Sequence, residues 1–270
     1  VTRPEGAKGE GALILVVNAG RKDVDYAHFR RHLPAGVRLT VHEDQALIAL
    51  QGPAAAGVLA GLMSSAANLG FMTGTAGTLL GQPVHVTRSG YTGEDGYEIA
   101  VPAAHAAAIW RKLLEHADVR PIGLGARDSL RLEAGLCLHG HDIDETTTPI
   151  EAGLLWSIQK RRRTEGGFPG AAIIQAQIAN GPPRLRVGIR PEGRAPAREG
   201  TEIQDAAGKT IGTVTSGGFG PSVNAPIAMG YVAATHAAVG TPVQLVVRGK
   251  PLPATIVAMP FAPHRYVRKG

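Results

Sequence analysis

The stretch Ser89-Gly-Tyr-Thr-Gly-Glu-Asp-Gly-Tyr-Glu-Ile99 decides how the middle of this 270-residue chain folds. Its centre, Gly93-Glu-Asp-Gly96, predicts a turn between two β-strands, because glycine tolerates the positive φ that a tight turn requires. After the turn the sequence alternates, so Tyr97 and Ile99 should face one side of a strand and Glu98 the other. Glu98 is then either a solvated surface charge or a fixed hydrogen-bond acceptor for a ligand.

The composition is that of a globular protein and excludes several classes. Charged residues make up 19% of the chain and hydrophobic residues 44%, over a length sufficient for two or more domains. The net charge of +6 favours an acidic partner or a polyanionic ligand. Aromatic residues are only 4%, and no apolar run is long enough to span a bilayer. We therefore expect no nucleic-acid partner and no membrane partner.

The single cysteine, Cys137, excludes an intrachain disulfide framework and a multi-cysteine zinc site. Its two leucine neighbours favour a small core residue over a nucleophile.

The start of the chain contains an apolar run with nothing to pair with. Residues 11–17 predict a buried strand, and Gly6 and Gly9 predict a turn before it. A turn joins two elements, yet only Val1 to Arg3 precede this one. We therefore expect that a partner strand is missing from the N-terminus.

The rest of the chain divides near Asn180-Gly-Pro-Pro183, and its first part mixes strands with helices, which is typical of an α+β fold. The expected helices cover residues 22–33, 54–62, 103–117 and 123–136, and the expected strands cover 39–43, 46–51, 78–87 and 97–101. Beyond the boundary, short β-segments separated by Gly/Pro turns indicate a small all-β barrel or sandwich. These segments are 185–189, 212–216, 227–232, 243–247 and 254–258.

Three clusters could carry chemistry. Arg127 can bind a carboxylate or phosphate through paired hydrogen bonds, or form a structural ion pair with a neighbour such as Glu133. The loop 139–149 holds two histidines and three acids, but it matches no zinc spacing, and turn-forming Asp and Thr explain it equally well. Lys160-Arg-Arg-Arg163 is either a solvated face or a docking patch for an acidic partner. The sequence contains no nucleophile elbow, Walker loop or Gly-x-Gly-x-x-Gly motif after a strand.

These segments together resemble the aminomethyltransferase, or T-protein, family of the glycine cleavage system. The resemblance implies an α+β, multi-domain cloverleaf fold around a folate-binding hole, lacking its N-terminal part and ending in an all-β barrel. It divides the chain into residues 1–43 with 142–180, a partial folate-binding domain at 44–141, and the barrel at 181–270. The matching segments are 17–20, 49–53, 87–99, 125–136, 142–149, 160–163, 168–170, 212–217, 228–232 and 259–261.

The resemblance also implies a reaction. The family transfers a methylene group from the aminomethyl-lipoyl arm of H-protein to tetrahydrofolate, with release of ammonia. Tetrahydrofolate is then a bound co-substrate, and lipoylated H-protein is the partner. The family pattern places folate contacts at Asn18, Tyr91, Glu98, Arg127 and Tyr266. The assignment of Glu98 to the pterin ring makes physical sense, because a carboxylate can accept from a ring N–H and an adjacent amino group together.

The chain departs from the family pattern at its start. The aspartate that assists catalysis in the family would lie upstream of Val1, so we expect no catalytic residue within the chain and little or no transferase activity from it. We assign no metal ligand. The Ala/Gly/Arg bias favours a bacterial, cytoplasmic protein, and the mitochondrial matrix is the expected compartment if the source is eukaryotic.

Three other interpretations remain. The folate-binding module of sarcosine or dimethylglycine oxidizing enzymes shares the hairpin, although residues 160–163 followed by Phe168-Pro-Gly170 favour the T-protein. The related iron–sulfur-assembly folate-binding protein is disfavoured, because its Lys-Gly-Cys motif is missing. A degenerate binder would keep folate affinity without catalysis.

Overall fold

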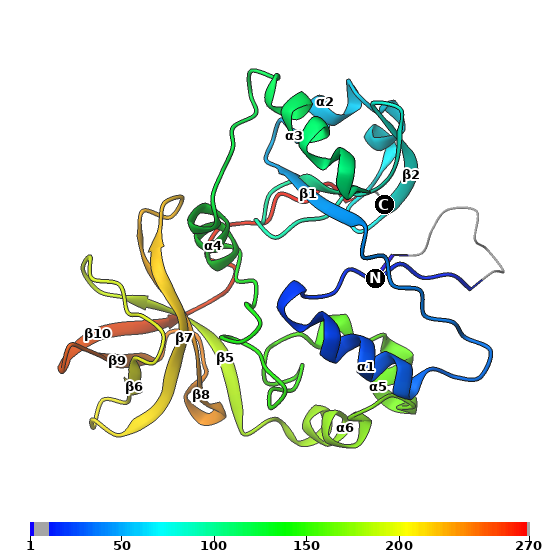
Figure 1. Ribbon diagram of the computed structural model, residues 1–270. Coiled ribbons are helices and arrows are strands. Elements are labelled where there is room, and N and C mark those ends of the chain that lie inside the picture. The colour runs from blue at the N-terminus through cyan, green and yellow to red at the C-terminus, as the bar shows by residue number, and fades with distance from the viewer. Residues whose placement is uncertain (3–10, 269–270) are drawn as a thin grey trace. The chain divides into compact units, whose positions relative to one another are not determined.

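The computed structural model describes residues 1–2 and 11–268, which form two compact units, each with its own hydrophobic core (Figure 1). Unit 1 comprises Val1–Ile122 and Arg265–Gly270, and unit 2 comprises Gly123–His264. The turn expected at Gly6 and Gly9 lies outside the described residues.

Unit 1 is built on a four-stranded antiparallel sheet with the order β1-β4-β3-β2. Helices α2 and α3 pack on this sheet, and Tyr97, Ile99 and Val101 project into the core beneath them, as the alternation predicts. The elements are η1 (Ala19–Arg21), α1 (Lys22–His32), β1 (Gln45–Gln51), α2 (Ala55–Ala60), η2 (Ser64–Asn68), β2 (Gly74–Leu79), β3 (Gln82–Thr87), β4 (Gly96–Pro102), η3 (Ala103–His105) and α3 (Ala106–Leu114).

The strand predicted over residues 11–17 is wrong. Ile14 forms only an isolated bridge with Thr2, and Leu13 and Val16 are exposed. An apolar run becomes a buried strand only when a neighbouring strand takes up its backbone hydrogen bonds. Within the described part of the chain, no strand runs alongside this segment.

Two other strand predictions also need correction. Residues 39–43 are irregular rather than extended in a sheet. The single strand predicted over 78–87 is a hairpin of β2 and β3, in which Leu79 pairs with Gln82. Its two-residue turn places Leu80 and Gly81 at φ 49° and 76°. Leucine rarely adopts a positive φ, so Leu80 gives no signal for this turn, and Gly81 is the only local one.

A buried ring nitrogen on β3 is expected to make unit 1 sensitive to acid. The Nε2 atom of His85 is buried, and within the described residues it has no hydrogen-bond partner. Burial lowers the pKa of His85 below its usual 6.5. The unfolded chain therefore takes up a proton at a higher pH than the folded chain does, so stability is lost as pH falls through about 6.5.

We expect His85→Gln to lose less stability than the wild type between about pH 7.5 and 5.5, because glutamine does not titrate there. Urea unfolding at a series of pH values measures the two slopes. Identical slopes would show that His85 does not contribute to acid sensitivity.

Unit 2 contains a closed six-stranded antiparallel barrel with the strand order β10-β5-β8-β7-β6-β9. Its core includes Ile189, Ile203, Leu245 and Ile256, which are almost completely buried. The barrel predicted from the five β-segments is confirmed, and β6, only three residues long, is the strand that the sequence pattern missed. The elements of unit 2 are α4 (Leu124–Glu133), η4 (Leu155–Ser157), α5 (Lys160–Glu165), α6 (Ala171–Asn180), β5 (Arg184–Pro191), β6 (Glu202–Gln204), β7 (Thr210–Gly220), β8 (Ala225–Ala233), η5 (Ala234–His236), β9 (Pro242–Val247) and β10 (Lys250–Val257).

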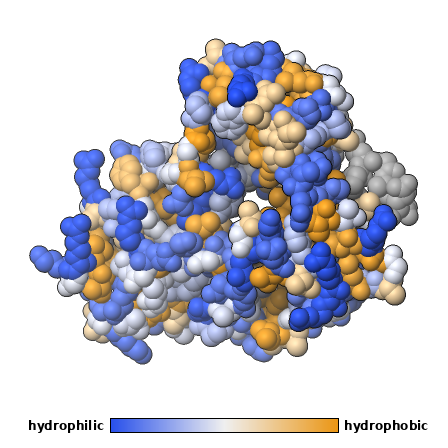
Figure 2. All heavy atoms as spheres, in the orientation of Figure 1, coloured by the Kyte–Doolittle hydropathy of each residue, from blue (hydrophilic) through white to orange (hydrophobic). Residues whose placement is uncertain are grey.

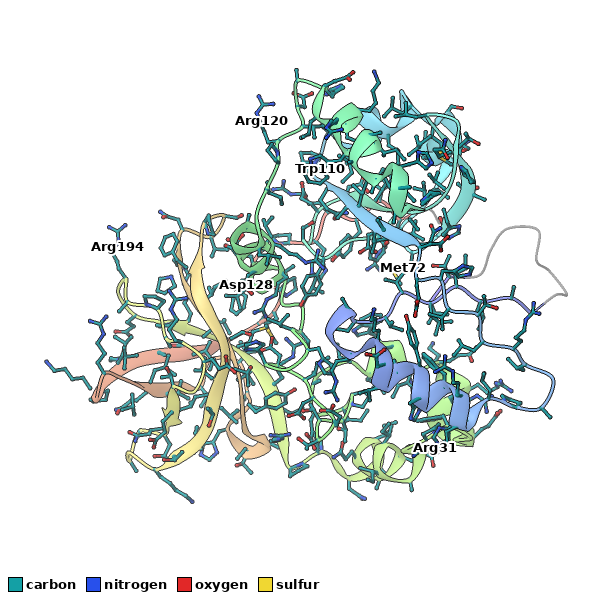
Figure 3. The ribbon with its side chains drawn as sticks, viewed as in Figure 1. Arg31, Met72, Trp110, Arg120, Asp128 and Arg194 are labelled. Atoms are coloured by element: carbon teal, nitrogen blue, oxygen red, sulfur yellow. The ribbon has the colours of Figure 1, made fainter. Side chains whose placement is uncertain are left out.

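Buried charged side chains fix α4 to the barrel. Glu133 accepts hydrogen bonds from the backbone N–H of Ser222 at 2.6 Å, from its hydroxyl at 2.8 Å, and from the N–H of Val223 at 3.1 Å. Arg131 reaches Asp142 at 2.8 Å and also bonds to Asp128, which is labelled on α4 in Figure 3. Because a buried charge is tolerated only when it is paired and hydrogen-bonded, these contacts define how α4 sits on β7 and β8.

The visible surface of both units mixes apolar and polar side chains (Figure 2). Among the described residues, no helix combines the length and apolar character needed to cross a membrane.

Candidate functional site

The loop between β3 and β4 is closed by a buried ion pair. Arg88 donates from Nε to one oxygen of Asp95 at 2.8 Å and from Nη2 to the other at 2.5 Å. Its Nη1 donates to the carbonyl of Leu69 at 2.7 Å. The hydrogen bond to Asp95 is the main cause that raises the pKa of Arg88. The hairpin predicted from the sequence is confirmed, and this forked pair joins the first and last residues of its loop, 88–95.

Gln51, at the end of β1, holds the same loop from the side. Its amide donates to the carbonyls of Ser89 at 3.0 Å and Tyr97 at 3.1 Å, and accepts from the Thr92 hydroxyl at 3.2 Å. A Cβ atom at Gly90 would lie 1.8 Å from the Gln51 side-chain oxygen. A side chain at position 90 would therefore displace the Gln51 amide from these hydrogen bonds. Gln51 was not predicted from the sequence, because no local pattern pairs it with a loop 38 residues further along the chain.

Glu98 lies on β4 next to this loop and is half-buried. The hydroxyl of Ser89 donates to Glu98 Oε2 at 2.7 Å, and Thr87 stands directly opposite Glu98 in the β3–β4 register. The carboxylate is thus held in a fixed position on a paired strand. This favours a hydrogen-bond acceptor of set direction over a freely solvated charge.

The C-terminal segment 265–268 runs along the loop in unit 1. The N–H of Arg265 donates to the carbonyl of Gly93 at 2.8 Å, and the N–H of Phe71 donates to the carbonyl of Val267 at 2.7 Å. The ring of Tyr266 stacks on Phe71 with centroids 3.9 Å apart and planes 7° from parallel. Burial raises the pKa of the Tyr266 hydroxyl. Two aromatic rings from distant parts of the chain therefore form a face-to-face stack near the hairpin loop.

The structure brings together three of the five residues that the resemblance singles out. Tyr91, Glu98 and Tyr266 all belong to the hairpin loop, its strand or the segment lying along it. Asn18 is exposed, and its side-chain oxygen accepts from the N–H of Gly20 at 3.1 Å, so it caps η1. Arg127 lies near the start of α4 in unit 2.

The loop 139–149 is organised by its aspartates. Asp142 is fully buried and accepts from Arg131, from the N–H of Leu138 and from the Ser216 hydroxyl, each within 2.8–2.9 Å. Asp144 accepts from Thr146 and neighbouring groups, and these bonds lower its pKa. Turn chemistry thus accounts for Asp144, and the buried ion pair with Arg131 accounts for Asp142. Among the residues that the structure describes, no group of three or more His, Cys, Asp or Glu is placed to hold a metal ion.

The basic cluster Lys160–Arg163 forms the start of α5, and much of it binds backbone. Arg162 donates to the carbonyl of Gly166 at 3.2 Å, and Arg163 donates to the carbonyls of Ile158 and Leu155 at 2.9 Å. Arg161 pairs with Glu165 at 3.4 Å on the exposed face. The guanidinium groups keep their positive charge, but two of them also fix the ends of η4 and α5.

Cys137 is partly buried, and burial raises the pKa of its thiol. A raised pKa leaves little thiolate at neutral pH, which disfavours a nucleophilic role.

Two family models match almost the whole chain. Residues 7–162 match the GCVT N-terminal domain, and residues 184–262 match the glycine cleavage T-protein C-terminal barrel domain. The chain belongs to the glycine cleavage T-protein family. The second match coincides with the barrel formed by β5 to β10, so the C-terminal fold of the T-protein family is present here as described.

Solved and curated relatives agree with this family. The crystal structure of glycine cleavage system aminomethyltransferase T from Bartonella henselae is 45% identical, has a TM-score of 0.86, and is matched over 93% of this chain and 69% of its own. Mitochondrial aminomethyltransferases of Mesembryanthemum crystallinum and Gallus gallus are 48% and 50% identical over 95% and 96% of this chain. The chain spans 65% of the length of the Mesembryanthemum relative and 68% of the Gallus relative.

Proposed function

We propose that this protein is the aminomethyltransferase of a glycine cleavage system. The proposed reaction is the one that the resemblance implies for the family: the aminomethyl group carried on the lipoyl arm of H-protein is accepted, and its methylene carbon is transferred to tetrahydrofolate, which releases ammonia and leaves dihydrolipoyl H-protein. The proposal is supported by membership of the T-protein family and by curated relatives named aminomethyltransferase.

The main structural support for tetrahydrofolate binding is the fixed carboxylate of Glu98. An ionised carboxylate only accepts hydrogen bonds, and its two oxygens match a ring N–H beside an amino group, which is the donor edge of a pterin. Ser89 holds Oε2 of this group, and Arg88 and Gln51 hold the loop beside it. A rigid acceptor loses little conformational freedom when a ligand binds, so its hydrogen bonds contribute fully to affinity.

The remaining folate contacts are proposed on the positions that match the family. Tyr91 and Tyr266 would contact the ligand beside Glu98, since all three belong to the same loop region of unit 1. Asn18 would act near the reactive end and Arg127 would bind an anionic part of folate, as its guanidinium suits a carboxylate.

We propose that the domains follow the division 1–43 with 142–180, 44–141 and 181–270.

We propose lipoylated H-protein as the partner. The net charge of +6 would attract that protein if it is acidic. The curated relatives from plants and chicken are named mitochondrial. We propose the mitochondrial matrix as the site of action if the source is eukaryotic, and the bacterial cytoplasm otherwise.

Calorimetric titration of tetrahydrofolate into the 270-residue protein and its Glu98→Gln variant tests the folate assignment. We expect the variant to bind about 10- to 100-fold more weakly, because hydrogen bonds to a charged group contribute about 1.5–3 kcal/mol. Glu115→Gln makes the same chemical change on the exposed end of α3, where Glu115 pairs with Lys112, and should leave affinity unchanged. Equal affinity of the wild type and Glu98→Gln would overturn the proposal.

A further inference from the structure

Three side chains form a short hydrogen-bonded chain on one face of the β3–β4 pair. Thr87 is directly opposite Glu98 in the register, and Ser89 follows two residues after Thr87. The Thr87 and Ser89 hydroxyl oxygens are 2.7 Å apart, and Ser89 Oγ is 2.7 Å from Glu98 Oε2. The contacts therefore run from Thr87 through Ser89 to the carboxylate.

The direction of the protons along this chain follows from the ionised carboxylate. A carboxylate can only accept, so the single Ser89 hydroxyl proton must point to Glu98. Ser89 is then the acceptor from Thr87, whose hydroxyl proton must point to Ser89. The other acceptor within reach of the Thr87 hydroxyl, the Glu98 carbonyl, is 3.5 Å away, at the limit of a hydrogen bond. A hydroxyl that accepts one bond while donating another becomes a stronger donor.

The neighbouring strand leaves room for the observed orientation of Thr87. A Cβ atom at Gly74 on β2 would lie 2.9 Å from the Thr87 methyl carbon, so only glycine leaves room for that methyl group. The methyl and hydroxyl groups share one carbon, and a β-branched side chain has few χ1 rotamers. Placing the methyl group against Gly74 therefore turns the hydroxyl toward Ser89.

We infer that Thr87 and Ser89 are positioning residues that hold the Glu98 carboxylate, as an ordered acceptor, in the orientation that receives the two donors of a pterin edge. This inference rests on the proposed function and adds the residues that orient its central acceptor. Because the carboxylate can only accept hydrogen bonds, it also defines the ligand class. A ring presenting a ring N–H beside an amino group fits the carboxylate, whereas a ring presenting a lone pair at either position is rejected.

A double-mutant cycle tests whether Ser89 acts through Glu98. Tetrahydrofolate is titrated calorimetrically into the 270-residue protein, Ser89→Ala, Glu98→Gln and the double variant. We expect Ser89→Ala to weaken binding about tenfold when Glu98 is present and less than about twofold when residue 98 is glutamine. A merely structural role of Ser89 would cost the same affinity in both backgrounds.

Two Thr87 variants distinguish the effect of the hydroxyl group on binding from the effect of side-chain shape. This test does not depend on whether Ser89→Ala folds. Thr87→Val keeps the branched shape and removes the hydroxyl, whereas Thr87→Ser keeps the hydroxyl. We expect Thr87→Val to bind about threefold more weakly than Thr87→Ser. Thr78→Ala, on the exposed part of β2, is the matched control and should bind as the wild type does. Circular dichroism establishes that each variant is folded.

The outcomes separate this inference from the proposed function. Equal affinity of the wild type and Glu98→Gln overturns both. A clear loss with Glu98→Gln, together with an equal cost of Ser89→Ala in both backgrounds, overturns only the positioning role. Equal affinity of Thr87→Val and Thr87→Ser would remove Thr87 from the inference.

Discussion

Replacement of Arg131 by methionine is expected to destabilise unit 2 by about 3–5 kcal/mol, because it leaves a buried carboxylate without its cation. The Arg131 side chain is 4% exposed and that of Asp142 is 0% exposed, and the two meet at 2.8 Å. Ser216 bonds to both members of the pair. Methionine fills a similar volume but cannot donate, so Asp142 would have to remain charged and unpaired or take up a proton.

The same guanidinium provides a matched control. Arg131 also pairs with Asp128 at 2.7 Å, but the Asp128 side chain is 60% exposed. Asp128→Asn should therefore change stability by less than about 1 kcal/mol. Urea unfolding followed by circular dichroism measures both variants, and hydrogen exchange in β7 and β8 shows whether the loss lies in the barrel. Equal effects of the two substitutions would mean that burial does not determine the strength of these pairs.

Removing the buried carboxylate as well should compensate for part of the effect of Arg131→Met. In the double variant Arg131→Met with Asp142→Leu, both buried charges are gone, and much of the stability lost in Arg131→Met should return. Ser216 would then lack both of its charged partners, so the recovery should be incomplete.

The fold was predictable where its signals are local. The hairpin around residues 88–95 follows from glycines at the turn and from the alternation after it, both within a dozen residues. The barrel follows from short β-segments at even spacing. Prediction failed at residues 11–17, because whether an apolar run becomes a strand depends on a distant partner. The turn at Leu80 was not predicted, because Leu80 adopts a positive φ that is rare for leucine.

The site was predictable only in part, for a related reason. Glu98 could be singled out as a carboxylate on a strand, and the resemblance gave it a role. The long-range contacts that hold the loop beside it, and those that hold α4 on the barrel, could not be found from spacing. Gln51 reaches the loop across 38 residues, and Glu133 reaches Ser222 across 89. Such pairs form only once the sheet and the barrel have formed, so they cannot be predicted from the local sequence pattern.

The Arg88–Asp95 pair should be the strongest single support of the hairpin loop. The two side chains are 6% and 12% exposed and meet at 2.5 Å, and Arg88 also donates to the Leu69 carbonyl. We expect Arg88→Met to destabilise unit 1 by about 3–5 kcal/mol, since Asp95 would be left almost buried and unpaired. Arg88→Lys should recover only part of this, because an ammonium cannot make the forked contact.

Lys112→Met provides the comparison within unit 1, since Lys112 and Glu115 form an exposed pair, 41% and 64% exposed, on α3. Urea unfolding should show a change of less than about 1 kcal/mol for it. The Arg88 variant should also weaken tetrahydrofolate binding at temperatures where it is still folded. The loop that Arg88 closes contains Ser89, which orients Glu98, so loosening the loop frees the acceptor that the ligand needs. Undiminished affinity in a destabilised Arg88→Met protein would show that the geometry of the site does not depend on this ion pair.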